Sequence, residues 1–508
     1  MVKMLGLLLL LGVCLAKKTH IAIVGTCNRT FLEPLISIAL ELSNRAKYQI
    51  TIVVPEKCEF PFYTYNFEVK YAGRYPYEDP EMEAITYWLS NPYENHDKQF
   101  EYFISEFLPQ LEAEMVPDLV KLWSNSTNQP ELIITNPWGF AGMDIAEILG
   151  VKLVVFLDFL DNYFWLVPEA TQFTYLPCFT TSFHQKYPDS YFERLWNLVQ
   201  KYRIKKKFSS KYYLGRNKVR KELGLKELEC PINGNCSTPP LYFIGTPMGY
   251  EAPRPLPTNF VLIGNPLQIE SRGHISSELT TWLDKSQNYE GFLFVAFGEN
   301  WPLSENDIVQ MRHAFRRLKM RVLIANKALS KYKDWSNNVW TETWVNQREV
   351  LRHSQCKAYY FHGGMISATE GILAEKPLIC MPLALDGYQH CRHLRDFGAA
   401  FLLDRVNLTS AQILDSVDKV VSDPSFKEKS SDLKKLFVYQ GGETLGADMI
   451  ELAVNYGYEA LIPKWYDIPW VQLYDLDIYS VLLSIFILLY KLSKYFVRWI
   501  LRKKKAIK

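Results

Sequence analysis

Short apolar runs alternate with amphipathic stretches through the first half of the chain. The runs are rich in Val, Ile and Leu, which predicts buried strands, whereas the stretches space their apolar residues as helices do. The strand candidates are residues 20–24, 49–54, 131–135 and 151–157, and the helix candidates are residues 31–45 and 139–149. Strands that alternate with helices of this length predict a parallel, doubly wound sheet.

A second set of the same kind follows the proline-rich stretch Pro253–Pro257. Its strand candidates are residues 291–297, 320–324, 357–361 and 378–381, and its helix candidates are residues 304–318, 364–374 and 386–396. Two such sheets joined by a linker leave a cleft between them, and small ligands usually bind in such a cleft.

The two ends of the chain carry targeting patterns. Met1 to Ala16 has a lysine, an apolar centre and a small-residue end, which is typical of a secretory signal peptide, although a buried first strand or helix would look similar. Near the other end, the apolar run 478–490 is followed by basic residues and by the cluster Arg502–Lys505. This pattern predicts a membrane span with a cytosolic tail. The alternative is a basic amphipathic helix that lies on the membrane.

These patterns together predict an α/β protein with two doubly wound, Rossmann-like parallel-sheet domains, a cleft between them and a C-terminal transmembrane helix. The predicted segments are a signal peptide (1–16), an N-terminal domain (17–252), an interdomain segment (253–267), a C-terminal domain (268–460), a transmembrane helix (476–497) and a basic tail (498–508).

Composition excludes one class of partner and suggests a compartment. Among 508 residues the formal net charge is only +2, so no electrostatic footprint indicates nucleic acid. Cys230 and Cys236 bracket a short loop and could form a disulfide in an oxidising lumen. Four asparagines begin glycosylation sequons, and only some of them are expected to be modified: Asn28, Asn125, Asn235 and Asn407.

The second half contains residues suited to binding a nucleoside diphosphate. His362-Gly363-Gly364 lies between a predicted strand and a predicted helix, where glycines let backbone N–H groups approach phosphates at a helix N-terminus. Ser367 adds a hydroxyl donor one turn later. Glu370 can accept hydrogen bonds from a ribose diol, and Trp344 offers a flat face to a base.

In this order and spacing, these residues resemble the donor-binding signature of UDP-glycosyltransferases, specifically the membrane-anchored, glucuronosyltransferase-like animal branch. The resemblance extends to Met381–Asp386 and Phe397–Ala400 and covers nearly the whole chain. It implies that the second domain holds the UDP-sugar and the first holds the acceptor. The implied roles are base stacking by Trp344, ribose binding by Gln347 and Glu370, diphosphate binding by His362, Gly363, Gly364 and Ser367, and sugar binding by Asp386.

The expected catalytic pair is missing. In the family a histidine after the first strand removes the acceptor's proton and an aspartate orients that histidine. The loop after Val24 contains no histidine, with Phe31 or Leu32 near its position, and Asn136 stands at the aspartate position.

The donor side of the sequence also departs from the family's pattern. Asn346 replaces the usual proline, Gly387 replaces a glutamine and Glu299 replaces a serine. A carboxylate at position 299 would repel a diphosphate unless it were turned away or paired. The centre of the signature, from His362 to Glu370, is nevertheless intact.

Two functions remain open at this stage. The first is transfer of a hexosyl or hexuronosyl group from UDP-sugar to a small lipophilic acceptor by inverting displacement, with weak turnover or a preference for easily deprotonated nucleophiles. The second is a catalytically silent homologue that binds nucleotide or lipophile as a carrier or partner subunit. A lumenal lectin-like binder is disfavoured by the predicted span. Residues 158–213 are rich in aromatics and would form either ordinary packing or an acceptor pocket or membrane-contacting face.

The resemblance implies no resident cofactor and no metal, because UDP-sugar is a co-substrate. His390 and His393 are expected on the surface of a helix rather than at a metal centre. The expected location is the endoplasmic reticulum membrane, as a single-pass type I protein with a lumenal body. The oligomeric state stays open.

Overall fold

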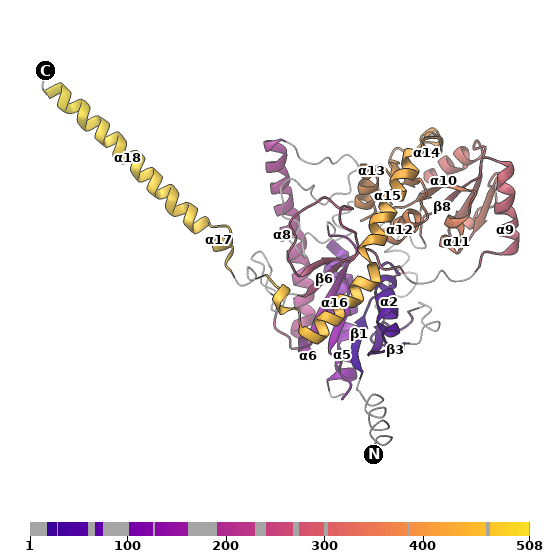
Figure 1. Cartoon of the computed structure of the whole chain (residues 1–508), viewed down its shortest axis with the longest axis horizontal. Helices are drawn as coiled ribbons and strands as arrows, with labels where there is room; N and C mark the ends of the chain where they lie inside the picture. Colours follow the sequence, from indigo (N-terminus) through magenta and orange to yellow (C-terminus); the bar gives the residue numbers. More distant parts are fainter. Residues whose placement is uncertain are drawn as a thin grey trace, which may run out of the picture.

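The computed structural model describes residues 18–27, 29–58, 67–74, 101–124, 127–160, 190–228, 240–267, 274–298, 303–383, 386–463 and 468–506. Within them, two parallel sheets lie in separate halves of the body, and a long helix projects away from it (Figure 1).

The first sheet has seven strands in the order β3-β2-β1-β4-β5-β6-β7. The strands are β1 (Thr19–Val24), β2 (Tyr48–Val54), β3 (Glu68–Tyr71), β4 (Leu132–Thr135), β5 (Lys152–Leu157), β6 (Leu241–Ile244) and β7 (Phe260–Leu262). Its helices are α2 (Arg29–Asn44), α5 (Leu108–Trp123), α6 (Phe140–Leu149) and α8 (Tyr191–Glu222), with the π-helical turn η2 (Phe103–Phe107) before α5. All strand pairs are parallel, which confirms the predicted class of sheet.

The second sheet has six strands in the order β10-β9-β8-β11-β12-β13, again all parallel. The strands are β8 (Phe292–Ala296), β9 (Arg321–Ala325), β10 (Val339–Glu342), β11 (Cys356–Phe361), β12 (Leu378–Cys380) and β13 (Ala400–Leu402). The helices are α9 (Ser277–Asp284), α10 (Glu305–Phe315), α11 (Gln347–Arg352), α12 (Met365–Leu373), α13 (Gly387–Phe397), α14 (Ser410–Ser422) and α15 (Ser425–Gln440). The predicted strands are present, and β10 and β13 are additional edge strands.

Strand β1 shows why the apolar runs form this sheet. Ile21 and Ile23 pack into the core under α2, whereas Ala22 and Val24 pack into a second core under α5 and α6. Side chains alternate between the two faces of a strand, so a strand covered by helices on both faces must be apolar throughout. The uninterrupted apolar runs of the sequence follow from this double burial.

Helix α16 (Gly442–Tyr456) packs on the first sheet although it follows the second in the chain. Ala447, Ile450 and Ala453 join the core formed by α2 and β1. Arg45, at the end of α2, reaches Asp448 at 2.7 Å and Glu451 at 3.0 Å. The predicted C-terminal domain, residues 268–460, includes α16, whereas the structure packs α16 on the first sheet. An apolar face predicts that a helix is buried but not which sheet buries it.

After α16 come the short elements η6 (Glu459–Leu461) and α17 (Trp470–Leu473), and then α18 (Leu476–Ala506). Among the described residues, one segment is long and apolar enough to cross a membrane: Leu476–Ile500, with a mean hydropathy of 1.7. No part of its most apolar window is buried, and α18 stands clear of the body (Figure 1). Its apolar surface therefore contributes nothing to either core.

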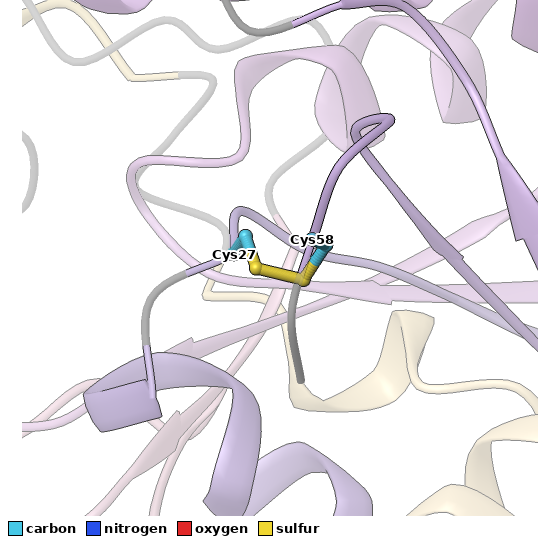
Figure 2. The surroundings of a disulfide bond; sticks show 2 residues. All are labelled: Cys27 and Cys58. Atoms are coloured by element: carbon cyan, nitrogen blue, oxygen red, sulfur yellow. A yellow bond between two sulfur atoms is a disulfide. The ribbon is translucent and has the colours of Figure 1, made fainter. Parts of the chain in front are cut away.

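The described residues include two disulfides, one in each half of the body. Cys27, in the loop after β1, bonds Cys58, in the loop after β2 (Figure 2). Cys380, at the end of β12, bonds Cys391 within α13. The sequence did not predict either pairing, because each depends on which loops the sheet order brings together. The predicted Cys230–Cys236 pair lies outside the described residues.

Candidate functional site

The turn between β11 and α12 is built around two glycines. Gly363 has φ +88°, and a Cβ there would lie 2.5 Å from the Cys391 sulfur and 2.7 Å from the Gly387 carbonyl oxygen. A Cβ on Gly364 would lie 2.5 Å from Nε2 of His362. Gly364 is also the N-cap of α12 and supplies no side-chain cap, so the first turn presents backbone N–H groups. This is the geometry that proteins use to bind phosphate oxygens.

Three predicted ribose and phosphate ligands lie together beside this turn. Gln347, the first residue of α11, donates from Nε2 to a carboxylate oxygen of Glu370 and, at 3.4 Å, to the hydroxyl of Ser367. Arg348 Nε donates to the other Glu370 oxygen at 2.8 Å. Burial raises the pKa of Glu370, and the charge of Arg348 opposes that rise. Arg348 therefore favours the ionised form of Glu370, which can accept hydrogen bonds from ribose hydroxyl groups. The sequence analysis did not predict a role for Arg348.

Trp344 lies between β10 and α11 with 46% of its surface exposed. A large apolar ring with an open face can stack on a base. The neighbouring Asn346, which replaces the family's proline, is the N-cap of α11, and its Oδ1 accepts from the Glu349 N–H at 3.0 Å. Asparagine therefore starts this helix by capping it, so the substitution leaves the helix that carries Gln347 intact.

His362 is held in its neutral form. Burial lowers the pKa of its imidazole to about 4, and a hydrogen bond that the ring donates to the Ala296 backbone opposes this shift. At neutral pH the ring therefore carries no positive charge and only one N–H. Any attraction of this turn for a phosphate would therefore come from backbone N–H groups and the helix terminus rather than from a charge on His362.

Asp386 lies at the start of α13, with 31% of its side chain exposed. Burial raises its pKa to about 6. Gly387 follows it, and a Cβ there would lie 2.9 Å from the His362 carbonyl oxygen. The family's usual glutamine is thus replaced by a glycine at residue 387, where the turn that carries His362 packs closely on α13.

The prediction that His390 and His393 lie on a helix surface is wrong. They are 0% and 4% exposed. Phe159, from the end of the first sheet, packs on both rings, with centroids 4.6 Å from His390 and 5.2 Å from His393. The prediction failed because the first domain packs on the polar face of α13. The sequence of one helix does not show which of its faces another domain buries.

Comparison with known proteins identifies the family to which this chain belongs. Residues 77–507 match the family described as UDP-glucuronosyl and UDP-glucosyl transferase. The chain belongs to this family.

Relatives and a solved structure are similar over most of the chain. The rat 2-hydroxyacylsphingosine 1-beta-galactosyltransferase is 26% identical over 388 residues, covering 74% of this chain and 69% of the relative. The rat UDP-glucuronosyltransferase 1A7 is 22% identical over 470 residues, covering 86% and 84%. The solved glycotransferase of kitacinnamycin superposes with a TM-score of 0.62 at 17% identity, covering 88% of this chain and all of that one. This last likeness shows the fold.

Phe31 and Leu32, the two candidates for the position of the family's missing histidine, differ in burial in this member of the UDP-glycosyltransferase family. Leu32 is fully buried in the core under α2. Phe31 is half-buried, and its ring contacts that of Trp138 at a centroid distance of 6.3 Å. Asn136 is fully buried at the end of β4, where its Oδ1 accepts from the Trp138 N–H at 2.9 Å. Phe31, rather than Leu32, therefore faces the Asn136 region.

A small pocket lies next to this region. It is lined by the loop after β1, the turn after β4 and the first turns of α5, including Thr26, Trp138 and Glu112. Among the described residues, neither the Thr26 hydroxyl nor the Asn136 amide nitrogen has a hydrogen-bond partner. Most lining residues are apolar, and the Thr26 hydroxyl is a polar group in the lining that can bond to another hydroxyl.

Behind Glu112 lies a buried charge network that the sequence did not reveal. Arg216 and Arg220, one turn apart on α8, both donate to Asp144 of α6, and Arg216 Nε lies 3.8 Å from Glu112. Burial opposes ionisation of Asp144, but the charge of Arg216, a hydrogen bond with Glu112 and the charge of Arg220 hold its pKa below the ordinary value. Burial raises the pKa of Glu112 well above its ordinary value, against the charge of Arg216. The network joins α5, α6 and α8 beside the small pocket.

Several predicted positions lie outside the described residues: Asn28, Asn125, Asn235, Cys230, Cys236 and Glu299. Asn407 is described and exposed, as a glycosylation site requires, and its amide donates to Asp404 at 3.0 Å.

Proposed function

We propose that the protein transfers a hexosyl or hexuronosyl group from a UDP-sugar to a small lipophilic acceptor by inverting displacement. One observation carries the proposal: Gln347, Ser367 and Glu370 lie within one hydrogen-bonded cluster beside the Gly363–Gly364 turn. Membership of the UDP-glycosyltransferase family supports the same donor.

The donor's parts match separate elements of the second domain. Trp344 would stack on uracil, and Gln347 with Glu370 would bind the ribose. His362, Gly363, Gly364 and Ser367 would hold the diphosphate at the start of α12, and Asp386 would bind sugar hydroxyls. As UDP departs, negative charge grows on the diphosphate, so N–H groups already aimed at it stabilise the transition state more than the ground state.

The acceptor would approach the first domain near the small pocket that Thr26 lines, with its nucleophilic atom close to Asn136. Its nucleophilic atom attacks the anomeric carbon from the face opposite UDP, the bond to UDP breaks, and the nucleophile's proton passes to solvent. The loop after β1 carries no histidine to take that proton. Acidic phenols and amines are therefore expected to react faster than alcohols, because their nucleophilic forms are accessible without a strong base.

The location belongs to the same proposal. The apolar segment of α18 and the basic residues after it support a single-pass type I protein with its body in the lumen of the endoplasmic reticulum. Two disulfides beside the sheets support an oxidising compartment.

The test combines binding and turnover on the detergent-solubilised full-length chain. UDP and UDP-sugar binding are measured by calorimetry, and UDP release is then followed with a panel of phenols, alcohols and amines. Binding followed by acceptor-dependent release is the expected result. Binding without release with any acceptor would replace the transferase with the silent carrier or partner subunit. The absence of binding would refute the donor site itself.

A further inference from the structure

The C-terminal half of α18 carries four basic side chains on one face. They recur at intervals of three or four residues, which is the spacing of one face of a helix, and they are Lys491, Lys494, Arg498 and Arg502. At 3.6 residues per turn, the four positions fall within roughly 80° around the helix axis. Because α18 is one unbroken helix, this register is kept throughout, and all four side chains are exposed. We call these four residues the basic stripe.

The helix offers the basic stripe no acidic partner. Residues 478–508 contain neither aspartate nor glutamate. Lys494 Nζ lies 4.8 Å from the centroid of the Tyr490 ring, but an aromatic ring has no net charge, so this contact leaves the positive charge in place. α18 also stands clear of the two sheets and the helices that cover them (Figure 1). The negative charge that balances the stripe is therefore expected from the surroundings of α18.

The apolar part of α18 is shorter than the hydrocarbon core of a bilayer. Leu476–Tyr490 rises by roughly 22 Å at 1.5 Å per residue, whereas the core is about 30 Å thick. In a spanning helix, Lys491 and Lys494 therefore lie just inside the core boundary, and their flexible stems carry the ammonium groups out to the phosphate layer. Arg498 and Arg502 follow in the next turns, and helical side chains lean towards the N-terminus, which here is towards the bilayer. All four cationic groups therefore converge on the phosphate layer of one leaflet.

Aromatic side chains indicate the same depth independently. Tyr495 and Trp499 lie within the turns that carry the basic stripe, and they are 71% and 44% exposed. Trp499 also stacks on Phe496, with ring centroids 5.9 Å apart. Tyrosine and tryptophan are enriched where hydrocarbon meets headgroups, because their rings are largely apolar and their O–H or N–H groups are polar. These turns of α18 are thus suited to the headgroup boundary by their aromatic as well as by their basic residues.

We propose that the basic stripe binds the headgroups of anionic phospholipids in the leaflet where α18 ends. Lysine and arginine donate charge-assisted hydrogen bonds to phosphate oxygens, and a guanidinium can do so through two parallel N–H groups. A zwitterionic lipid offsets this attraction with its own cation, so a lipid with a net negative charge is preferred. Four cations on one face meet the same few lipids, whereas cations spread around the helix would each meet different ones. The stripe requires the proposed membrane span, but neither the donor site nor turnover.

The test reconstitutes the full-length chain into phosphatidylcholine vesicles that contain a trace of spin-labelled lipid. Electron paramagnetic resonance measures the share of labelled lipid that the protein immobilises, first for phosphatidylserine and then for phosphatidylcholine. A preference for phosphatidylserine of at least about fivefold is expected, because one Lys or Arg near the surface contributes about that factor. The preference should shrink as salt is added, since salt screens the attraction. Lys494→Gln with Arg498→Gln should bring the two lipids close to equal.

A rearranged variant separates the basic stripe from the mere number of charges. Ser493→Lys with Lys494→Ser, combined with Arg498→Trp and Trp499→Arg, exchanges two pairs of neighbours. Composition and net charge stay the same, but both cations turn by about 100° around the helix. This variant should lose the preference as the double glutamine variant does.

Each other outcome overturns the proposal. Equal association of the two lipids with the unmodified chain would refute it, and so would a full preference in the rearranged variant, which would reduce the stripe to bulk charge. Lys319→Gln with Lys435→Gln removes two exposed charges from the body and should keep the preference; its loss there would assign the lipid contact to the body instead. Release of the chain from vesicles by alkaline carbonate would refute the span and the stripe with it, whereas UDP binding in detergent tests the donor site separately.

Discussion

Arg348 Nε donates to the carboxylate of Glu370 at 2.8 Å, and the two side chains are 14% and 11% exposed. The pair places a negative charge where the ribose would lie, and it does so inside the domain rather than on its surface. Burial raises the pKa of Glu370, and the guanidinium of Arg348 is the largest influence that opposes this rise.

Glu370→Ala is expected to weaken UDP binding by roughly 10- to 100-fold, since hydrogen bonds to a charged group contribute about 1.5–3 kcal/mol. Glu370→Gln should show an intermediate loss, because it keeps one acceptor without the charge. Calorimetric titration with UDP measures both, and the exposed Glu428→Ala on α15 is the control. Unchanged affinity in Glu370→Ala would rule out the ribose assignment.

Trp344→Ala tests base stacking separately from ribose binding. Because the ring is half-exposed, its loss should cost little stability, whereas loss of a stacked base costs about 1–3 kcal/mol of binding. Affinity for UDP should fall, and the melting temperature should stay within a degree or two. A fall in stability with UDP affinity unchanged would instead make Trp344 a packing residue.

His362 should make stability depend on pH between about 4 and 6.5. Burial lowers the pKa of its imidazole to about 4 in the folded protein, so the unfolded chain binds its proton more tightly. Stability is therefore retained above the unfolded pKa of about 6.5 and is lost as the pH falls towards 4, by at most about 3 kcal/mol. His362→Gln should flatten this part of the curve, measured by urea unfolding at several pH values. An unchanged slope would contradict the burial of a neutral imidazole.

Arg216→Ala should destabilise the first domain by about 3–5 kcal/mol, because it leaves the buried Asp144 short of one of its two cationic partners. Lys121→Ala is the matched control. Its exposed pair with Asp118, at 3.0 Å, should contribute less than about 1 kcal/mol. Urea unfolding followed by circular dichroism compares them. Equal effects of the two substitutions would show that the buried network does not hold α5, α6 and α8 together.

The sequence predicted those parts of the fold that depend on local pattern. Apolar runs located the strands because parallel strands are buried on both faces, and the glycines of residues 363–364 located the turn between β11 and α12, where a side chain would clash. It could not predict groupings created by tertiary structure. Phe159 and His390 come from different domains, and Cys27 meets Cys58 only because β1 and β2 are neighbours.

Some apparent departures from the family's pattern also required the structure. Asn346 looks like a lost proline in the sequence, yet it caps α11. Gly387 looks like a lost sugar ligand, yet a side chain there would crowd the His362 turn. These two donor-side substitutions are therefore accommodated by local packing. No comparable substitute for the missing histidine lies in the loop after β1, in residues 25–27, which the structure describes.

Phe31→His combined with Asn136→Asp should raise turnover if a base is all that the site lacks. Phe31 is half-buried and contacts Trp138, whose N–H donates to Asn136, so an imidazole there would lie near the introduced carboxylate. A positioned general base contributes typically about 10²–10⁴-fold, so a gain of at least about tenfold in UDP release with an alcohol acceptor is expected. The rate should also acquire a dependence on a group that titrates near pH 6–7. Leu32→His with Asn136→Asp is the control, because Leu32 points into the core and this double variant should lose stability without gaining activity. No gain from the Phe31 pair, with UDP binding intact, would show that the acceptor side lacks more than a base.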